Sequence, residues 1–216
     1  PPFFLQRLVA SSDRNGVLSP ATLLRAFLVD GQIVFWVELY RDTVRRPGDF
    51  IVNPGSGGRY RFWQHVSEEA QKVAGDIQRA GGEALAVPVD VTSAEKTRAM
   101  ADTALQKYGR IDVLINNAAL YSAIKKKPFS EISGEEWDRV MAVNLKGLFL
   151  CVQAVYPAMK KQGKGKVINI SSGTVLGGTP LFLHYVTSKA GVIGFTRALA
   201  RELGPANIGI NAITPG

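Results

Sequence analysis

The sequence predicts an α/β protein built on a doubly wound parallel sheet. Three observations carry this prediction: strand-like and helix-like segments alternate strictly from residue 67 onward, the strand-like segments are apolar throughout, and they end in small or polar residues. Strands that are apolar on both sides are buried on both faces, so helices must cover the sheet on each side. Right-handed crossovers between the strands then give a doubly wound sandwich.

The elements follow one another along residues 67–216. Residues 67–82 have the helical spacing of apolar and small residues, with Ser67 at the N-cap position and glycines at the end. Further helices are expected over 93–109, 134–163 and 184–204, and adjacent parallel strands over 84–91, 111–119, 166–172 and 208–213.

The composition of the chain changes near residue 66. Residues 1–66 contain eight arginines and no lysine, whereas residues 67–216 contain twelve lysines and six arginines. Two of the three tryptophans, Trp36 and Trp63, also lie in the first segment. We therefore divide the chain into residues 1–66, an unassigned segment that is not native to the fold, and residues 67–216, a partial α/β domain.

The composition also excludes several classes of protein. The only cysteine, Cys151, lies in an apolar run, which excludes an internal disulfide and zinc-type spacing and favours a reducing compartment, the cytoplasm. The best candidate for a membrane span, residues 26–40, is interrupted by Asp30 and Glu38, and the start of the chain does not read as a signal peptide. No membrane partner is therefore expected.

The net charge of +8 would permit an acidic partner. The basic residues are scattered, however, and the one compact run, Lys125–Lys127, has no RNA-binding signature beside it. A solvated loop is the favoured interpretation of this run, and no nucleic-acid partner is expected.

Ser172, Tyr185 and Lys189 form the informative constellation, with Asn144 upstream. Tyr185 and Lys189 are four residues apart in a helical pattern, so their side chains share one face. A phenol has a reference pKa of about 10. A nearby ammonium lowers that pKa, and the phenol can then exchange a proton with a carbonyl or alcohol oxygen. A lone pair with this spacing is also common on helix surfaces, so the interpretation depends on its context.

Three strand ends supply that context. Ser172 closes the strand 166–172, Asn116–Ala119 end the neighbouring strand, and the last strand runs into Pro215 and Gly216. The carboxyl ends of the strands form the edge at which doubly wound sheets bind ligands. These small and polar groups are therefore expected to line one crevice.

At these positions the sequence resembles the short-chain dehydrogenase/reductase family. The matching motifs, in family order and at family-like spacing, are VDV (89–91), NNAA (116–119), VNLKG (143–147), VINISS (167–172), Tyr185-x-x-x-Lys189 and NAITPG (211–216). The resemblance covers about 150 of the 216 residues. It implies a Rossmann-like fold, an NAD(P)-dependent oxidoreductase and a homo-oligomer.

The resemblance also implies roles for the matched residues. Tyr185 would be the general acid/base, and Lys189 would bind the nicotinamide ribose hydroxyls and lower the pKa of the tyrosine. Ser172 would hydrogen-bond the substrate oxygen, and Asn144 would hold a water in a proton relay. The implied cofactor-binding residues are Asp90, Val91, Asn116, Ala118, Tyr185, Lys189, Pro215 and Gly216. No metal ligand is implied.

Other roles remain open for several positions. Asp90 could also be an anion at the N-terminus of a helix, and Asn116 could form a structural link between strands. Ser171 is expected to make a local hydrogen bond. His184 adjoins the tyrosine, and an orientation toward substrate is the less favoured of its roles. Asn169 is expected to join a strand-end network or to face a neighbouring helix.

The sequence departs from the family pattern at both ends. A glycine-rich turn, T-G-x-x-x-G-x-G, which would hold a pyrophosphate, is expected around residues 35–45, but FWVELYRDTVR there contains no glycine. GSGG at 55–58 lacks the spacing and is interpreted as a loop, and the chain stops at Gly216. We therefore expect an incomplete or frame-shifted enzyme, truncated at both ends, in preference to a first segment that rebuilds the missing strand.

The favoured function is hydride transfer between NAD or NADP and a ketone or secondary alcohol, as in a 3-oxoacyl reductase or a small alcohol dehydrogenase. The competing hypotheses are a non-catalytic family member that cannot hold dinucleotide and a basic nucleic-acid binder. The choice between NAD and NADP stays open, because RYRFWQH (59–65) does not match the family where the second strand should end. The small-molecule substrate is a carbonyl or an alcohol that the sequence does not identify.

Overall fold

The computed structural model describes residues 28–29, 32–33, 68–121 and 124–215. The chain divides into two compact units, residues 1–88 with 121–125 and residues 89–120 with 126–216. The segment 1–66, which the sequence marks as unassigned and not native to the fold, lies almost entirely outside the described residues. The expected N-cap Ser67 lies outside them too.

The described part of the first unit holds one short strand pair and one helix. The strands β1 (Leu28–Val29) and β2 (Gln32–Ile33) are antiparallel. The helix α1 spans Glu68–Arg79, as the sequence predicts. It is followed by Gly81, whose φ of 84° lies in the left-handed region that glycine adopts without strain.

The prediction of a strand over residues 84–91 is wrong. Residues 84–90 have no regular secondary structure, and only Glu83 makes an isolated bridge. A strand is held by its hydrogen-bond ladder, and Pro88 has no N–H to donate to one. The boundary between the two units also falls after Pro88. Apolar composition alone therefore did not make this segment a member of the sheet.

The second unit is built on three strands, β3 (Val113–Asn116), β4 (Gly165–Ile170) and β5 (Ile208–Ile213). They are parallel and lie in the order β3-β4-β5, with Ile115 opposite Ile168 and Val167 opposite Ile210. Three of the four predicted strands are therefore adjacent and parallel. The α/β fold class with a parallel sheet is confirmed.

The helices of the second unit are α2 (Ala94–Tyr108), α3 (Gly134–Met141), α4 (Gly147–Gln162), α5 (Thr174–Gly177) and α6 (Leu183–Leu203), with 3₁₀ turns at Phe129–Glu131 and Gly204–Ala206. Local signals explain several of their ends. Ser93 Oγ accepts a hydrogen bond from Lys96 N (3.3 Å) at the start of α2, and Gly109 ends that helix with a φ of 73°. Ser133 Oγ caps α3 by accepting from Glu136 N (3.1 Å).

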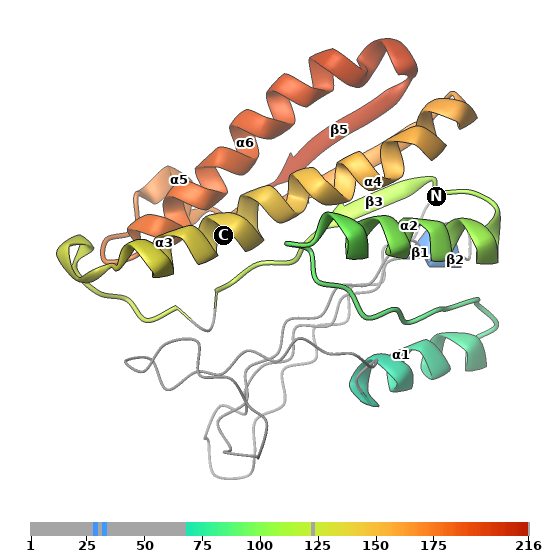
Figure 1. The fold of residues 1–216 in the computed structure, drawn as a ribbon, viewed down its shortest axis with the longest axis horizontal. Coiled ribbons are helices and arrows are strands. Elements are labelled where there is room, and N and C mark those ends of the chain that lie inside the picture. Colours follow the sequence, from blue (N-terminus) through green and yellow to red (C-terminus); the bar gives the residue numbers. More distant parts are fainter. Residues whose placement is uncertain (1–27, 30–31, 34–67, 122–123, 216) are drawn as a thin grey trace. The chain divides into compact units, whose positions relative to one another are not determined.

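One long helix runs through α3, a π-helical segment and α4 (Figure 1). The π segment, η2 (Ala142–Lys146), is closed by a hydrogen bond from Gly147 N to Ala142 O. The whole helix has 29 residues and a window of mean hydropathy 1.4, so by length and composition it is able to cross a membrane. The best candidate identified from the sequence was a different stretch, residues 26–40, most of which lies outside the described residues. The buried core helices of globular proteins meet the same criterion, and α4 packs on β3, β4 and α2.

Helices α4 and α6 cover one face of the sheet. α4 contacts β3 and β4, whereas α6 contacts β4 and β5. Figure 1 shows α4 next to β3 and α6 next to β5. The fully buried apolar side chains of these elements include Val155, Val167 and Val192. Burial of each contributes about 1.5–3 kcal/mol. This layer fixes the carboxyl ends of the strands, where the candidate site lies.

Candidate active site

Tyr185 and Lys189 lie in the first turns of α6, and both are buried. The ammonium nitrogen of Lys189 is 5.8 Å from the centroid of the Tyr185 ring, so the two side chains share one face, as their spacing predicts. Lys189 Nζ also donates a hydrogen bond to the carbonyl oxygen of Ile170 (2.7 Å). Because Ile170 is the last residue of β4, a positive charge is fixed beside the phenol at the carboxyl edge of the sheet.

The chain contains a second tyrosine–lysine pair with the same spacing. Lys160 Nζ lies 5.6 Å from the centroid of the Tyr156 ring on α4. Lys160 is in the last turn of that helix, shortly before β4 begins at Gly165, so this pair lies near the amino end of the strand. Ligands bind doubly wound sheets at the carboxyl ends. Location therefore separates the two pairs, although their ring geometry does not.

Phe182 orients the ring of Tyr185. The two rings are stacked, with centroids 4.6 Å apart and an interplanar angle of 24°. Phe182 is itself buried and occupies the N-cap position of α6. An aromatic pair of this kind contributes roughly 0.5–1.5 kcal/mol beyond the burial of its surface. Sequence reasoning missed Phe182, for which the signal was an aromatic residue three positions before the tyrosine.

The two adjacent serines after β4 have different partners. Ser171 Oγ donates a hydrogen bond to Lys189 O (2.7 Å), which ties the end of the strand to α6. Ser172 Oγ accepts hydrogen bonds from Thr174 N (3.2 Å) and Thr174 Oγ1 (2.9 Å). Both bonds use the Ser172 oxygen as acceptor, so its own proton can be donated to another oxygen. We predict that Ser172 Oγ and Tyr185 OH face one cleft, in which both could bind one substrate oxygen.

Asn144 lies in the π segment and is 1% exposed. Its Oδ1 accepts a hydrogen bond from Leu120 N (2.7 Å), and its Nδ2 donates to Leu120 O (3.2 Å) and Ser188 Oγ (3.0 Å). Ser188 Oγ in turn donates to Tyr185 O (2.7 Å). The amide thus links the loop after β3 to the first turn of α6. A water held by Asn144 would need the second lone pair of Oδ1 or the backbone carbonyl.

Asn116, expected near the cofactor, belongs to a buried chain of side-chain hydrogen bonds. Its Nδ2 donates to Asn169 Oδ1 (2.9 Å), and Asn169 Nδ2 donates to Thr196 Oγ1 on α6 (2.9 Å). The Asn116 side chain therefore links two strands, which is the structural role left open for it by the sequence. The expectation for Asn169 is confirmed, since it joins both a strand end and a helix.

Asp90 and Val91 lie in the loop that precedes α2. Asp90 Oδ1 accepts hydrogen bonds from Thr92 N (2.9 Å) and Thr92 Oγ1 (2.7 Å), which makes a tight Asx turn. Val91 is buried against Gly147, where an added Cβ would lie 2.8 Å from Val91 Cγ2. Glycine at the start of α4 is therefore required for this close approach.

The end of β5 lies beside the loop that carries Ser172. Gly173 N donates a hydrogen bond to Pro215 O (2.6 Å), and Ser171 N donates to Ile213 O (2.8 Å). Pro215 is exposed, and Ala118 after β3 is partly exposed. Gly216 lies outside the described residues. The predicted convergence of strand ends is thus present for β4 and β5.

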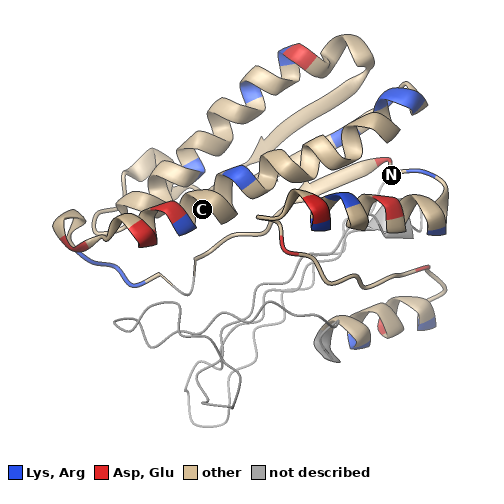
Figure 2. Cartoon of the chain, viewed as in Figure 1, with Lys and Arg blue, Asp and Glu red and all other residues tan. Residues whose placement is uncertain are grey.

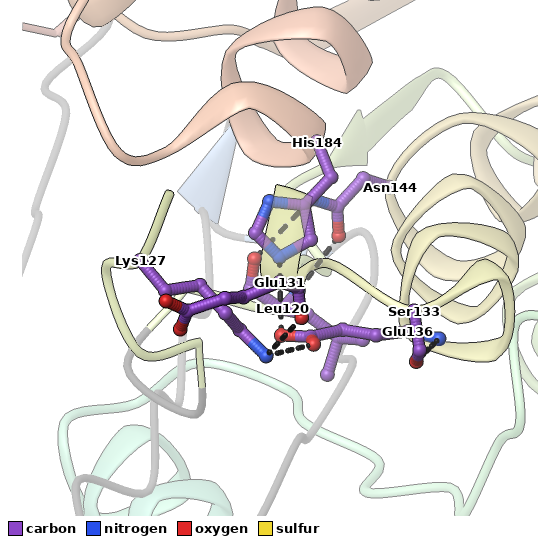
Figure 3. Close-up of polar contacts among 7 residues, drawn as sticks. All are labelled: Leu120, Lys127, Glu131, Ser133, Glu136, Asn144 and His184. Atoms are coloured by element: carbon purple, nitrogen blue, oxygen red, sulfur yellow. Dashed lines mark hydrogen bonds and ion pairs between the residues drawn. The ribbon is translucent and has the colours of Figure 1, made fainter. Parts of the chain in front are cut away.

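A buried ion cluster is formed by Lys127, Glu136 and His184, the residue before Tyr185 (Figure 3). Glu136 on α3 is 6% exposed and pairs with Lys127 Nζ (2.5 Å) and with Nε2 of the fully buried His184 (3.3 Å). Burial raises the pKa of the Glu136 carboxyl, but the hydrogen bonds and charges of Lys127 and His184 outweigh burial and hold it below its ordinary value. The His184 side chain therefore faces Glu136. This is not the orientation toward substrate, which was the less favoured of its expected roles. Sequence reasoning did not find this cluster.

Within the described residues no group of three or more histidine, cysteine, aspartate or glutamate side chains is arranged to hold a metal ion. The chemistry available at the strand edge is that of a phenol beside a fixed cation, with a serine hydroxyl on the neighbouring loop. Such a set can transfer a proton to or from an oxygen and stabilise charge on that oxygen.

Comparison with known proteins gives a consistent match. The family model described as short chain dehydrogenase matches residues 55–216. The chain is 40% identical over 150 residues to a 3-oxoacyl-[acyl-carrier-protein] reductase from Synechocystis sp., covering 69% of this chain and 60% of that protein. It is 40% identical over 179 residues to a protein of the same description from Thermotoga maritima, covering 77% of this chain and 72% of that one.

Solved structures agree with this match. The crystal structure of an NAD+-bound xylitol dehydrogenase is similar with a TM-score of 0.66 and 33% sequence identity, covering 69% of this chain and 56% of that one. The chain spans about 60% of the length of the first curated relatives.

Proposed function

Because this chain belongs to the short chain dehydrogenase family, we propose that it is an oxidoreductase that transfers a hydride between NAD or NADP and a ketone or secondary alcohol. The observation that carries the proposal is the position of Lys189 between the Tyr185 ring and the carboxyl end of β4. The names of the relatives support the substrate class, since they are a 3-oxoacyl-[acyl-carrier-protein] reductase and a xylitol dehydrogenase.

In this proposal Tyr185 gives or takes the proton of the reacting oxygen, and Lys189 supplies the adjacent positive charge. The bound nicotinamide would supply or accept the hydride. Ser172 would donate its hydroxyl proton to the same oxygen as negative charge develops there. Asn144 would hold a water of the proton relay through its backbone or its remaining lone pair. Proton transfer by a positioned side chain contributes about 10²–10⁴-fold in rate.

The proposed cofactor site combines Tyr185 and Lys189 with residues from three segments, before α2, at the end of β3 and after β5. These residues are Asp90, Val91, Asn116, Ala118, Pro215 and Gly216. The side chains of Val91 and Asn116 are buried and make protein contacts. These two residues would therefore shape the site through their backbone. Asp90, Ala118 and Pro215 retain exposed surface on which a dinucleotide could lie.

Partners and compartment follow from the same reasoning. We propose a small-molecule carbonyl or alcohol as substrate, a homo-oligomer as the functional state, and no nucleic acid or membrane as partner. The single cysteine, which is buried, is consistent with a reducing compartment such as the cytoplasm.

The proposal is tested by replacing Tyr185 with phenylalanine. Tyr185→Phe should lower turnover of ketones by about 10²–10⁴-fold, because the phenolic proton is lost while the ring stays stacked on Phe182. Tyr156→Phe is the matched control, since Tyr156 has the same lysine spacing and ring geometry at the other end of β4. Equal turnover by the parent chain and Tyr185→Phe, measured with NADH and NADPH on a panel of ketones, would refute the proposal.

A second candidate function is that of a non-catalytic member that holds dinucleotide poorly. It is favoured by residues 35–45, which contain no glycine where the phosphate-binding turn is expected. Such a turn supplies backbone N–H groups and a helix N-terminus to the pyrophosphate. We therefore expect weak dinucleotide binding by the chain and gain of affinity when a G-x-x-x-G-x-G unit replaces that stretch. Fluorescence titration with NADH and NADPH measures the dinucleotide affinity of both chains. Tight binding by the unmodified chain would contradict this expectation.

A further inference from the structure

Glu136 is a buried carboxylate held by residues from two separate segments. Its Oε2 pairs with Lys127 Nζ (2.5 Å), and its Oε1 lies 3.3 Å from His184 Nε2 (Figure 3). A buried carboxylate is costly unless it is paired and hydrogen-bonded. Glu136 is therefore fixed only while Lys127 and His184 stay where they are, and it fixes them in return.

The segment that carries Lys127 lies along the start of α6. Lys127 N donates a hydrogen bond to Leu181 O (2.9 Å), and Lys127 Nζ reaches Glu131 O (3.4 Å). Lys126 Nζ lies 5.8 Å from the centroid of the Phe182 ring. Phe182 stacks on Tyr185. One route of contact therefore runs from Glu136 through the 126–127 segment and Phe182 to the tyrosine ring.

The second route runs through His184, the residue before Tyr185. His184 is fully buried, and its Nδ1 makes no hydrogen bond within the described residues. The bond of its Nε2 to Glu136 is thus its one polar anchor there. α6 begins at Leu183 without a side-chain cap. The first turn of a helix leaves its N–H groups without helical partners, so its position depends on tertiary contacts such as this one.

We propose that Glu136 is a positioning residue that sets the orientation of the Tyr185 ring through His184 and through the 126–127 segment. Its importance for catalysis rests on the proposed function, because Tyr185 is the acid/base only in that proposal. The positional effect itself is independent of turnover. Glu136→Gln keeps the size of the side chain but removes the negative charge of the carboxylate, with which both Lys127 and His184 pair.

The test uses the full chain with 3-fluorotyrosine at its six tyrosines. The fluorine resonance of Tyr185 is assigned as the one lost in Tyr185→Phe. It should shift or broaden in Glu136→Gln, whereas the resonance of Tyr156 should not move. Glu135→Gln is the matched control, because Glu135 is the neighbouring carboxylate in α3 and is exposed. It should leave all six resonances in place.

Kinetics give the second measurement. Glu136→Gln should lower kcat roughly 10-fold or more with little change in KM, since misplacement of a reacting group by about 1 Å costs up to about 10²-fold. Glu136→Asp, which keeps the charge, should recover part of the loss in kcat. Should Glu136→Gln fail to fold, Lys127→Gln makes the same test from the partly exposed side of the pair.

The possible outcomes separate the two proposals. A folded Glu136→Gln chain with an unmoved Tyr185 resonance overturns the positioning role and leaves Glu136 a contributor to stability only. A moved resonance together with full activity of Tyr185→Phe sustains the positioning role and rejects the proposed function. A moved resonance with loss of activity in both variants supports both.

Discussion

At the scale of single residues, location decides chemistry more than spacing does. Tyr156 and Tyr185 each have a lysine four residues further on, at 5.6 Å and 5.8 Å from their ring centroids. Only Lys189 bonds to the carbonyl that ends β4. The sequence could separate the two pairs because Tyr185 lies in the first turn of a helix that follows a strand, whereas Lys160 lies in the last turn of a helix that precedes one.

Other residues of the candidate site could not be predicted in this way. Glu136 reads as one acidic residue among several in a first helical turn, and its partner His184 is 48 positions away. Their pairing depends on how α3 lies against α6, which periodicity does not reveal. The stacking of Phe182 on Tyr185 likewise depends on the turn that precedes α6.

Cys151 gives a residue-scale prediction about pH. Burial raises the pKa of its thiol to about 12 from an ordinary value of 9.0. In the unfolded chain the thiol ionises near its ordinary pKa, whereas the folded chain keeps the proton until a higher pH. Folding stability should therefore fall as pH rises above 9.0, and Cys151→Ala should remove that part of the pH dependence.

Alkylation provides the measurement for Cys151, which is the only cysteine of the chain. At pH near 8, iodoacetamide should label the folded chain at least about tenfold more slowly than the chain in urea, because the thiolate is the reactive form. Equal rates by mass spectrometry would show that the thiol is accessible and would contradict the prediction.

At the scale of elements, caps were more informative than apolar composition. Ser93 and Gly109 fix the ends of α2 within a residue of the prediction, since both act through local hydrogen bonds and backbone conformation. The segment 84–91 is as apolar as β3, but it contains Pro88 and forms no ladder within the described residues. Strand formation depends on a partner strand, and the sequence of one segment does not supply that information.

Two glycines in helices give a matched pair of variants at this scale. Gly147→Ala should destabilise the chain by about 1–3 kcal/mol, because its Cβ would meet Val91 Cγ2 at 2.8 Å in a packed interface. Gly194→Ala in α6 should stabilise it by about 0.5–1 kcal/mol, since no atom lies within 4 Å of the added carbon. Urea unfolding followed by circular dichroism measures both. Equal effects of the two substitutions would show that Val91 moves aside freely.

At the scale of the whole molecule, one buried chain of polar side chains crosses the second unit. Asn116 on β3, Asn169 on β4 and Thr196 on α6 are joined by two hydrogen bonds of 2.9 Å. The sequence suggested a structural role for the two asparagines, but it did not reveal that Thr196 closes the chain. That closure requires the register between β4 and α6.

Asn169→Ala tests this chain of hydrogen bonds. It should lower the free energy of unfolding by about 2–4 kcal/mol, because Asn116 and Thr196 both lose a buried partner. Asn211→Ala, at an exposed position of β5, is the control and should change stability by less than about 0.5 kcal/mol. Denaturant unfolding provides the comparison, and similar losses for the two variants would mean that the buried chain is dispensable.

The fold class and the family could be predicted from the sequence of the second unit because its motifs are dense and local. The match to the family begins at residue 55, ahead of the compositional change near residue 66. The boundary of family likeness is therefore not the boundary of composition. Apolar periodicity and arginine content report different properties of a chain, and only the first bears on the fold.

The π turn between α3 and α4 also governs how this protein tolerates changes of length. Each residue of an α-helix turns the chain by about 100°, so removal of one residue from Ala142–Lys146 would act mainly as a rotation. α3 would revolve about its axis, and Glu136 would leave the side that meets His184 on α6. An insertion would turn α3 the other way. The long helix therefore consists of two α-helices, α3 and α4, whose faces are rotated relative to each other by the π-helical segment around Asn144. The fold depends on that rotation, because it decides which side of α3 meets α6.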